Sequence, residues 1–373
     1  MAYLSGISTF QQNLEGLDDI QGIESYLDSL PKLPQYFSIN ETVLFYRNDI
    51  ESVIDRLKKR LQFNLISLNP IKLIYSNTSR NVESIFTTLV LIIPGSRPST
   101  LRAIGIAKPS VWATITNKLS KSMYPYLMPI YYKQNELEKA FSSLQIYLGN
   151  DYQIRISDLT LKESRGIDFQ THINDQDTKR WWTNIPINEM FSLAKEQSFI
   201  FTSLKFSVEF EKTAYTPTKK TINGRISKFG RIYYSNSYSI LNNGLISHLE
   251  EFSEKRLKLF ENRSIRDQQF QQSKPIQISY SYDIFKDKEE IRKTGDIFSK
   301  YPNASRIEFH CNPYYHASIA DFIDGSSFDI WITSLRKIII IPQSKASVQA
   351  FERLTTFVFS NFGEGIVDDF VVD

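Results

Sequence analysis

Runs in which apolar and polar residues alternate recur in the second half of this 373-residue chain, and they constrain its fold more than any other feature. In the segment 199–211, Leu204, Phe206, Val208 and Phe210 alternate with other residues, which is the period of a strand with one buried face. Short turn sequences separate such runs, and amphipathic helices follow them. This order predicts an α+β fold with largely antiparallel sheets backed by helices.

Two segments of the second half follow the same order of strand, strand and helix. They are residues 203–257 and residues 327–359. The second ends in a helix whose apolar stripe includes Val348, Phe351 and Leu354, and Gly363 is placed to stop it. We interpret the pair as a possible weak internal duplication.

The first half alternates helices with strands. Segment 48–61 has the spacing of an amphipathic helix, and segment 135–148 has a second one with Asn135 and Glu138 as its expected capping pair. Strands are expected at 71–75 and 84–93, and segment 101–115 is expected to form strands around a break at Lys108-Pro109.

The length of the chain predicts two domains. Residues 166–185 are polar and irregular, and we place the junction there. The expected organisation is an N-terminal α+β domain over 1–165 and a C-terminal α+β domain over 186–373.

Composition narrows the class of protein. A single cysteine, Cys311, rules out an internal disulfide and a zinc site built from several cysteines. The first residues lack the basic and apolar regions of a secretory signal. The longest apolar run, 85–93, is about half of the ~20 residues that a membrane-spanning helix needs. We therefore expect a soluble, cytoplasmic protein with no membrane association.

Charge is unevenly distributed along the chain. Segments 84–135 and 212–249 each contain six basic residues and no acidic one, although the formal net charge is only +3. Lysine and arginine displace counterions from phosphates, and tyrosines among them offer faces for bases to stack on. The residues predicted to bind nucleic acid are Arg97, Arg102, Lys108, Lys212, Lys219, Lys220, Arg225, Lys228, Arg231 and Tyr233.

Other interpretations of these residues stay open. The basic residues are also typical of solvated strand faces, and the tyrosines of cross-strand pairs. Adjacent Trp181 and Trp182 suit stacking on a base, anchoring a partner, or packing in a core. The leading hypothesis is a non-enzymatic accessory or regulatory protein that binds DNA or RNA. The first alternative is a protein–protein assembly subunit or homo-oligomer.

No familiar catalytic motif for a hydrolase, kinase or dinucleotide-binding enzyme occurs in the sequence. The weak catalytic candidates are His310, His316 and Asp321, which make a nuclease or other hydrolase the second alternative. A hairpin with its turn at Asp324-Gly325 would place His316 and Asp321 on opposite faces. We therefore predict neither a metal site nor a cofactor.

Overall fold

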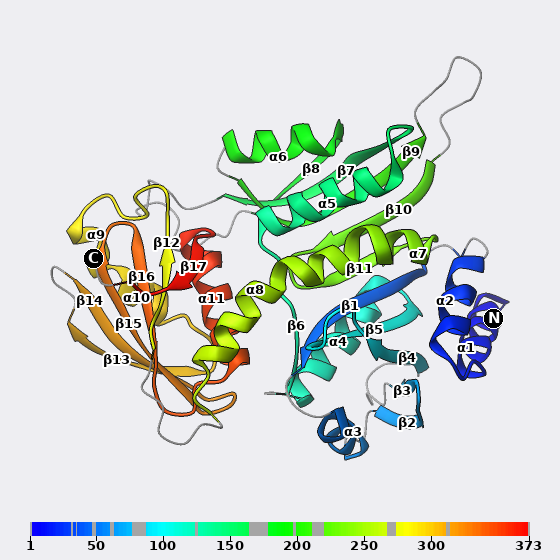
Figure 1. Cartoon of the computed structure of the whole chain (residues 1–373), viewed down its shortest axis with the longest axis horizontal. Helices are drawn as coiled ribbons and strands as arrows, with labels where there is room; N and C mark the ends of the chain where they lie inside the picture. The colour runs from blue at the N-terminus through cyan, green and yellow to red at the C-terminus, as the bar shows by residue number, and fades with distance from the viewer. Residues whose placement is uncertain are drawn as a thin grey trace. The chain divides into compact units, whose positions relative to one another are not determined.

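The computed structural model describes residues 2–30, 33–34, 36–46, 50–59, 63–76, 87–123, 126–163, 178–196, 199–210, 220–266, 274–310 and 314–371 (Figure 1). Contacts divide the chain into two units. Unit 1 comprises Met1–Leu161, Lys179–Glu196 and Phe201–Ser253, and unit 2 comprises Lys162–Thr178, Gln197–Ile200 and Glu254–Asp373. Both units combine helices with antiparallel strands, which confirms the predicted fold class.

Unit 1 is built on one large sheet whose strands follow the order β2-β3-β4-β5-β1-β11-β10-β9-β7-β8, with β6 also paired to β1. The strands are β1 (Ser38–Tyr46), β2 (Phe63–Leu68), β3 (Ile71–Ser76), β4 (Thr87–Pro94), β5 (Thr100–Ala107), β6 (Leu127–Pro129), β7 (Tyr152–Glu163), β8 (Thr178–Pro186), β9 (Phe199–Phe210), β10 (Lys220–Ser227) and β11 (Arg231–Tyr234). Strand β1 sits mid-sheet and pairs antiparallel with β5 and β11.

Helices cover both faces of this sheet (Figure 1). They are α1 (Ala2–Glu15), α2 (Ile20–Ser29), α3 (Ile50–Lys58), α4 (Pro109–Met123), α5 (Gln134–Leu148), α6 (Ile187–Glu196), α7 (Tyr238–Leu241), the π-helical turn η1 (Asn242–Ile246) and α8 (Ser247–Arg263), which continues into unit 2. On one face, Phe141 of α5 packs against Phe206 of β9. On the opposite face, the Trp112 indole of α4 donates a hydrogen bond to Thr42 of β1.

The prediction of strands over 101–115 with a break at Lys108-Pro109 was right for β5 and wrong after the break, where helix α4 begins. The threonines, valine and isoleucine of 111–116 favour strands, but Pro109 is at the first position of the helix, where proline is well tolerated. Buried Trp112, Ile115 and Leu119 then share one face of the helix. Gly105 of β5 has no Cβ, and a Cβ there would lie 2.6 Å from the Trp112 ring. Only glycine therefore allows α4 to pack this closely on the sheet.

The structure differs from two other predictions in detail. The strand expected in the second basic segment is a hairpin, β10 and β11, which turns at Gly230 with φ +71°. The cap of α5 lies at Lys133, whose backbone N–H donates to the Glu136 carboxylate, rather than at Asn135.

Unit 2 contains a six-stranded antiparallel sheet in the order β13-β14-β15-β16-β12-β17. Its elements are β12 (Ile276–Ser279), α9 (Lys288–Arg292), α10 (Thr294–Phe298), β13 (Ala304–His310), β14 (Tyr315–Asp321), β15 (Ser326–Ser334), β16 (Lys337–Pro342), α11 (Val348–Phe362) and β17 (Ile366–Asp369). Helix α11 buries its predicted apolar stripe, and Phe351 packs against Phe328 of β15. Gly363 ends the helix with φ +92°.

The units differ from the domain ranges expected from sequence. Strands β9, β10 and β11, which lie after residue 186, belong to the sheet of unit 1. The expected junction 166–185 overlaps β8 from residue 178 onwards, and residues 166–177 lie outside the described residues. Among the described helices, none is long and apolar enough to cross a membrane.

Candidate functional site

Basic residues on the neighbouring strands β9 and β10 project from the same face of the unit 1 sheet. Lys205 of β9 lies directly opposite Arg225 of β10, and Arg225 lies directly opposite Tyr233 of β11. Directly opposed residues project from the same face of a sheet, with their Cβ atoms about 5 Å apart. The alternate residues Leu204 and Ile226 are buried on the other face. The strand period therefore brings two cations and a tyrosine together.

These residues line a pocket of about 990 Å³, which we call the sheet pocket. Its floor includes Lys205, Arg225 and Tyr233, and the start of α4 with Lys108 forms part of its wall. Exposed aromatic side chains also line it: Tyr36 is 72% exposed and Trp182 is 68% exposed. The pocket therefore combines basic groups with aromatic side chains that are exposed to solvent.

Asp158 of β7 organises two of the basic side chains. Arg180 of β8 donates hydrogen bonds of 3.1 Å and 2.7 Å to the two oxygens of its carboxylate, and Arg225 donates to the same carboxylate. Burial favours a raised pKa for Asp158, but the hydrogen bonds from Arg180 and the charge of Arg225 outweigh it, and the pKa is lowered. Asp158 is therefore ionised at neutral pH and holds both guanidinium groups at the pocket.

Arg180 also lies over the Trp182 ring, with 4.4 Å between its guanidinium carbon and the ring centroid. Alternation along β8 directs both side chains to the pocket, whereas Trp181 is absent from its lining. Lys108 lies 5.7 Å from the centroid of Phe37. Neither Lys108 nor Lys205 forms an ion pair with any residue that the structure describes. Both ammonium groups are thus available to an anionic ligand.

The structure brings Lys108, Arg225 and Tyr233 together from the predicted set and places the others elsewhere. Arg231 lies close enough to the Tyr233 hydroxyl for its charge to act on the pKa of that group, but it does not line the pocket. Lys228 is buried, with its ammonium 5.8 Å from the centroid of Tyr131. Arg97 pairs with Glu251 at 3.3 Å. Lys212 and Lys219 lie outside the described residues, as does the side chain of Lys220.

Arg102 is buried on the opposite face of the sheet. Its guanidinium donates hydrogen bonds of 2.9 Å and 2.8 Å to the Glu250 carboxylate and lies 3.7 Å from Glu41. Ser96 donates its backbone N–H to Glu250 at 2.7 Å. Because its charge is neutralised inside the protein, we do not include Arg102 in the functional site.

Glu41 is buried next to this pair and has an unusual pKa. Burial raises the pKa to about 7, although the Arg102 charge and a 3.1 Å hydrogen bond from the Tyr234 hydroxyl lower it. Its Oε1 accepts no hydrogen bond from the described residues. Glu41 therefore takes up a proton on folding near neutral pH.

We expect Glu41→Gln to change how stability depends on pH. In the wild type, the contribution of Glu41 to the free energy of unfolding is fully present below about pH 4.5 and is lost as pH rises through about 7, because ionising Glu41 in the folded state costs energy. The loss is about 3 kcal/mol, at ~1.4 kcal/mol per unit of pKa difference. Thermal unfolding between pH 5 and 8 measures it. Glu41→Gln should gain stability relative to wild type as pH rises, and the exposed Glu196→Gln should not. A difference in stability between Glu41→Gln and the wild type that is constant across pH would contradict this expectation.

The weak catalytic candidates do not converge. His310 and His316 are directly opposed on β13 and β14, whereas Asp321 ends β14 on the other face. His316 and Asp321 are five positions apart along the strand, about 16 Å. The His316 ring packs between Phe309 and Trp331, with centroids 4.8 Å and 5.2 Å away. Among the described residues, no group of three His, Cys, Asp or Glu side chains is placed to hold a metal ion.

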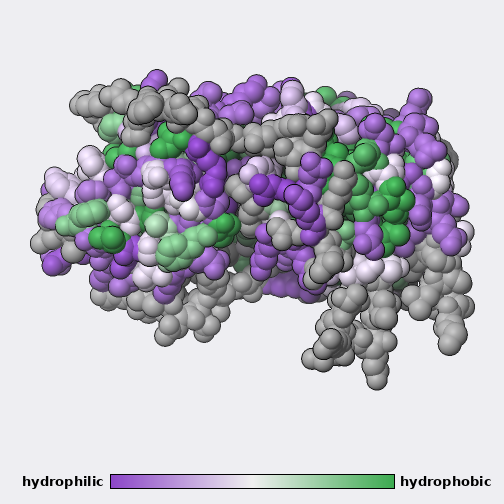
Figure 2. Space-filling view, turned by 90° about the horizontal axis from the view of Figure 1, so that it is seen from below, coloured by the Kyte–Doolittle hydropathy of each residue, from purple (hydrophilic) through white to green (hydrophobic). Residues whose placement is uncertain are grey.

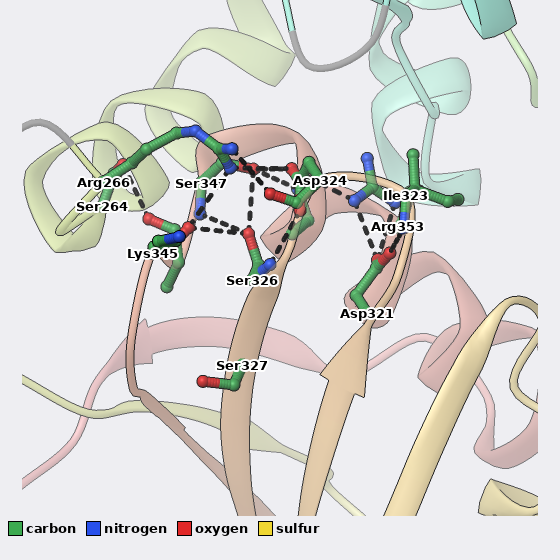
Figure 3. Close-up of polar contacts among 12 residues, drawn as sticks. Ser264, Arg266, Asp321, Ile323, Asp324, Ser326, Ser327, Lys345, Ser347 and Arg353 are labelled. Carbon is green, nitrogen blue, oxygen red and sulfur yellow. Dashed lines mark hydrogen bonds and ion pairs between the residues drawn. The ribbon is translucent and has the colours of Figure 1, made fainter.

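Asp321 instead belongs to a structural cluster at the end of the β14–β15 hairpin (Figure 3). Its carboxylate accepts hydrogen bonds from Arg353 of α11 at 2.9 Å and 2.8 Å and from the Tyr301 hydroxyl at 3.0 Å. Asp324 lies 3.3 Å from Arg353 and accepts from Ser347, the N-cap of α11. The Ile323 backbone N–H donates to the other oxygen of Asp321 at 2.8 Å, so both oxygens already accept hydrogen bonds. The cluster joins the hairpin loop to α11.

The loop of this hairpin also differs from the predicted two-residue turn. Asp321 pairs with Ser326, so the loop spans the four residues 322–325, and Gly325 ends it with φ +75°. Asp324 is drawn inward by Arg353 and Ser347. The charge of Arg353 and these hydrogen bonds lower the Asp324 pKa despite burial, which alone would raise it.

In comparisons with protein-family models, curated proteins and solved structures, nothing matches this chain. The functional argument therefore depends on the residues of the sheet pocket themselves.

Proposed function

We propose that this protein binds nucleic acid through the sheet pocket, in a non-catalytic accessory or regulatory role. The observation that carries the proposal is the cross-strand row of Lys205, Arg225 and Tyr233, which opens into one pocket with Lys108 and Trp182. Cations attract the phosphate backbone, and exposed aromatic rings stack on bases whatever their sequence.

The direct opposition of Lys205 and Arg225 supports a phosphate ligand. Like charges directly across a strand pair destabilise a sheet. Asp158 offsets part of this repulsion, because it binds Arg225 and its charge also interacts with Lys205. A bound phosphate would offset the remainder, which gives the arrangement a function that a merely solvated strand face does not have.

The experiment that tests the proposal is titration of the protein into labelled single-stranded DNA and RNA at several salt concentrations. For about three neutralised phosphates, the slope of log K against log salt is expected near −2. Comparable affinity at low and high salt, or no binding at low salt, would contradict a phosphate-directed interaction.

We expect Trp182→Ala to weaken binding of single-stranded oligonucleotides by about 5- to 150-fold, since a base stacked on an aromatic ring contributes ~1–3 kcal/mol. Fluorescence anisotropy measures the change. The matched control is Trp181→Ala, which removes the neighbouring indole outside the pocket and should bind like the wild type. Equal losses from both variants would show that the ring in the pocket has no special role.

The alternative functions receive less support. Exposed Ile307, Phe309 and Trp331 on β13 and β15 are the feature that a protein partner or a second copy of the chain would use. Figure 2 shows hydrophobic residues at the surface where unit 2 lies, among hydrophilic ones. A hydrolase centred on His310, His316 and Asp321 would need these side chains to converge, and they do not. A cytoplasmic location stays a prediction from sequence.

A further inference from the structure

The charge balance of the sheet pocket indicates what kind of phosphate it accepts. Lys108, Arg180, Lys205 and Arg225 line it against the single carboxylate of Asp158, so its described lining residues carry a net charge of +3. Asp158 forms ion pairs with the two arginines and with neither lysine among the residues that the structure describes, although its charge also acts on Lys205. A complementary ligand therefore carries about three negative charges close together, more than one internal phosphodiester supplies, since each carries one charge.

The spacing of Lys205 and Arg225 favours a doubly charged phosphate. Their Cβ atoms are about 5 Å apart, so one phosphate can contact both side chains. Arg225 uses one N–H for Ser203, at 3.2 Å, and one for Asp158, out of the five that a guanidinium has. A phosphate monoester carries about −1.5 to −2 charges and three acceptor oxygens. It matches this pair of cations better than a diester does.

The size and rings of the pocket exclude a bare phosphate as the best ligand. Its volume of about 990 Å³ is at the upper end of the ~300–1,000 Å³ typical of small-molecule sites. Tyr36 and Trp182 line it with largely exposed side chains, and Arg180 lies over the Trp182 ring. Bases in a duplex are already stacked and paired, whereas those of a single strand can splay out onto such rings.

We propose that the sheet pocket binds the phosphorylated end of a single-stranded nucleic acid, with the terminal phosphate between Lys205 and Arg225 and the adjoining bases against Trp182. This inference rests on the proposed function and specifies its ligand. A terminal phosphate and one adjoining diester together supply the three charges that the lining residues call for.

The test compares fluorescein-labelled octathymidines that differ at one end. One series carries a 5′-phosphate or a 5′-hydroxyl, the other a 3′-phosphate or a 3′-hydroxyl, and a blunt duplex with 5′-phosphates completes the set. In at least one series, the phosphorylated strand is expected to bind about tenfold more tightly than its hydroxyl counterpart and than the duplex, because it adds a charge-assisted contact. The series that shows this preference identifies whether the pocket binds the 5′ end or the 3′ end.

Two variants connect the preference to the pocket. Lys205→Ala should remove most of the preference while retaining weaker binding of both strands, and Lys205→Arg should keep it. Circular dichroism of each variant establishes that it is folded. A preference that survives Lys205→Ala in a folded protein would overturn the placement of the terminal phosphate.

The outcomes separate this inference from the proposed function. Equal affinity for phosphorylated and hydroxyl ends in both series would overturn the end-binding inference and leave strand binding intact. Failure of every oligonucleotide to bind would overturn both. Adenosine diphosphate that binds as tightly as the phosphorylated strand would also overturn the inference, because the ligand would then be a nucleotide rather than a strand end.

Discussion

Exchanging Lys205 and Arg225 for glutamate is expected to lower the affinity for single-stranded oligonucleotides by at least about 100-fold, because the change replaces attraction of the phosphates by repulsion at two contacts. The two residues are adjacent on β9 and β10, so the variant reverses the charge of the pocket floor at one place. Arg180 keeps its hydrogen bonds to Asp158, and the buried faces of both strands are untouched. Fluorescence anisotropy with octathymidine at low salt measures the loss.

The matched control is Lys121→Glu with Lys255→Glu. These lysines are exposed, do not line the sheet pocket, and change the net charge of the protein by the same amount. If binding depends on the pocket, the control loses only the small share that comes from overall charge. Similar losses in the two double variants would show that binding follows net charge, and the pocket would then have no specific part in it.

Replacing Arg102 by methionine is expected to lower the free energy of unfolding of unit 1 by about 3–5 kcal/mol, because it leaves buried carboxylates without their counter-charge. Glu250 is 0% exposed and accepts both guanidinium hydrogen bonds, and Glu41 is 0% exposed beside it. Denaturant unfolding followed by tryptophan fluorescence measures the loss, since Trp112 reports on the core of this unit.

The double variant Arg102→Met with Glu250→Gln separates buried charge from lost packing. Glutamine can still accept the hydrogen bond from the Ser96 backbone but carries no charge to bury. We expect the double variant to recover much of the stability and to bind oligonucleotides like the wild type. Recovered stability with weakened binding would return Arg102 to the nucleic-acid-binding residues, against its position in the structure.

The sequence was sufficient for the strands and helices whose period is regular. The alternation of Leu204, Phe206 and Val208 predicted β9 and its buried face, and the stripe of Val348, Phe351 and Leu354 predicted α11. These patterns are local, because the spacing of apolar residues along one helix or strand is enough to show which of its faces packs against the core. Helix α4 was missed because local preference for strands competed with tertiary packing of Trp112 on Gly105.

The candidate site depended on pairings between strands. Arg225 and Tyr233 were predicted from the basic segment, but Lys205 and Asp158 were not, because nothing local shows that β9 and β7 lie beside β10. Arg102 has the same charge as Lys108 and lies in the same basic segment of the sequence. It is nevertheless buried, where its guanidinium pairs with Glu250 of α8. A carboxylate more than a hundred residues away decides whether such a cation faces solvent.

The sequence by itself therefore determined the fold class, the absence of disulfides within the chain and the segments that carry positive charge, since composition and period are properties of short stretches. The tertiary structure alone decided which of those charges meet. Strand register brings Lys205, Arg225 and Tyr233 into one row, and the start of α4 brings Lys108 to the same pocket. Long-range pairing sets both arrangements, because the free energy of packing depends on residues that are far apart in the chain.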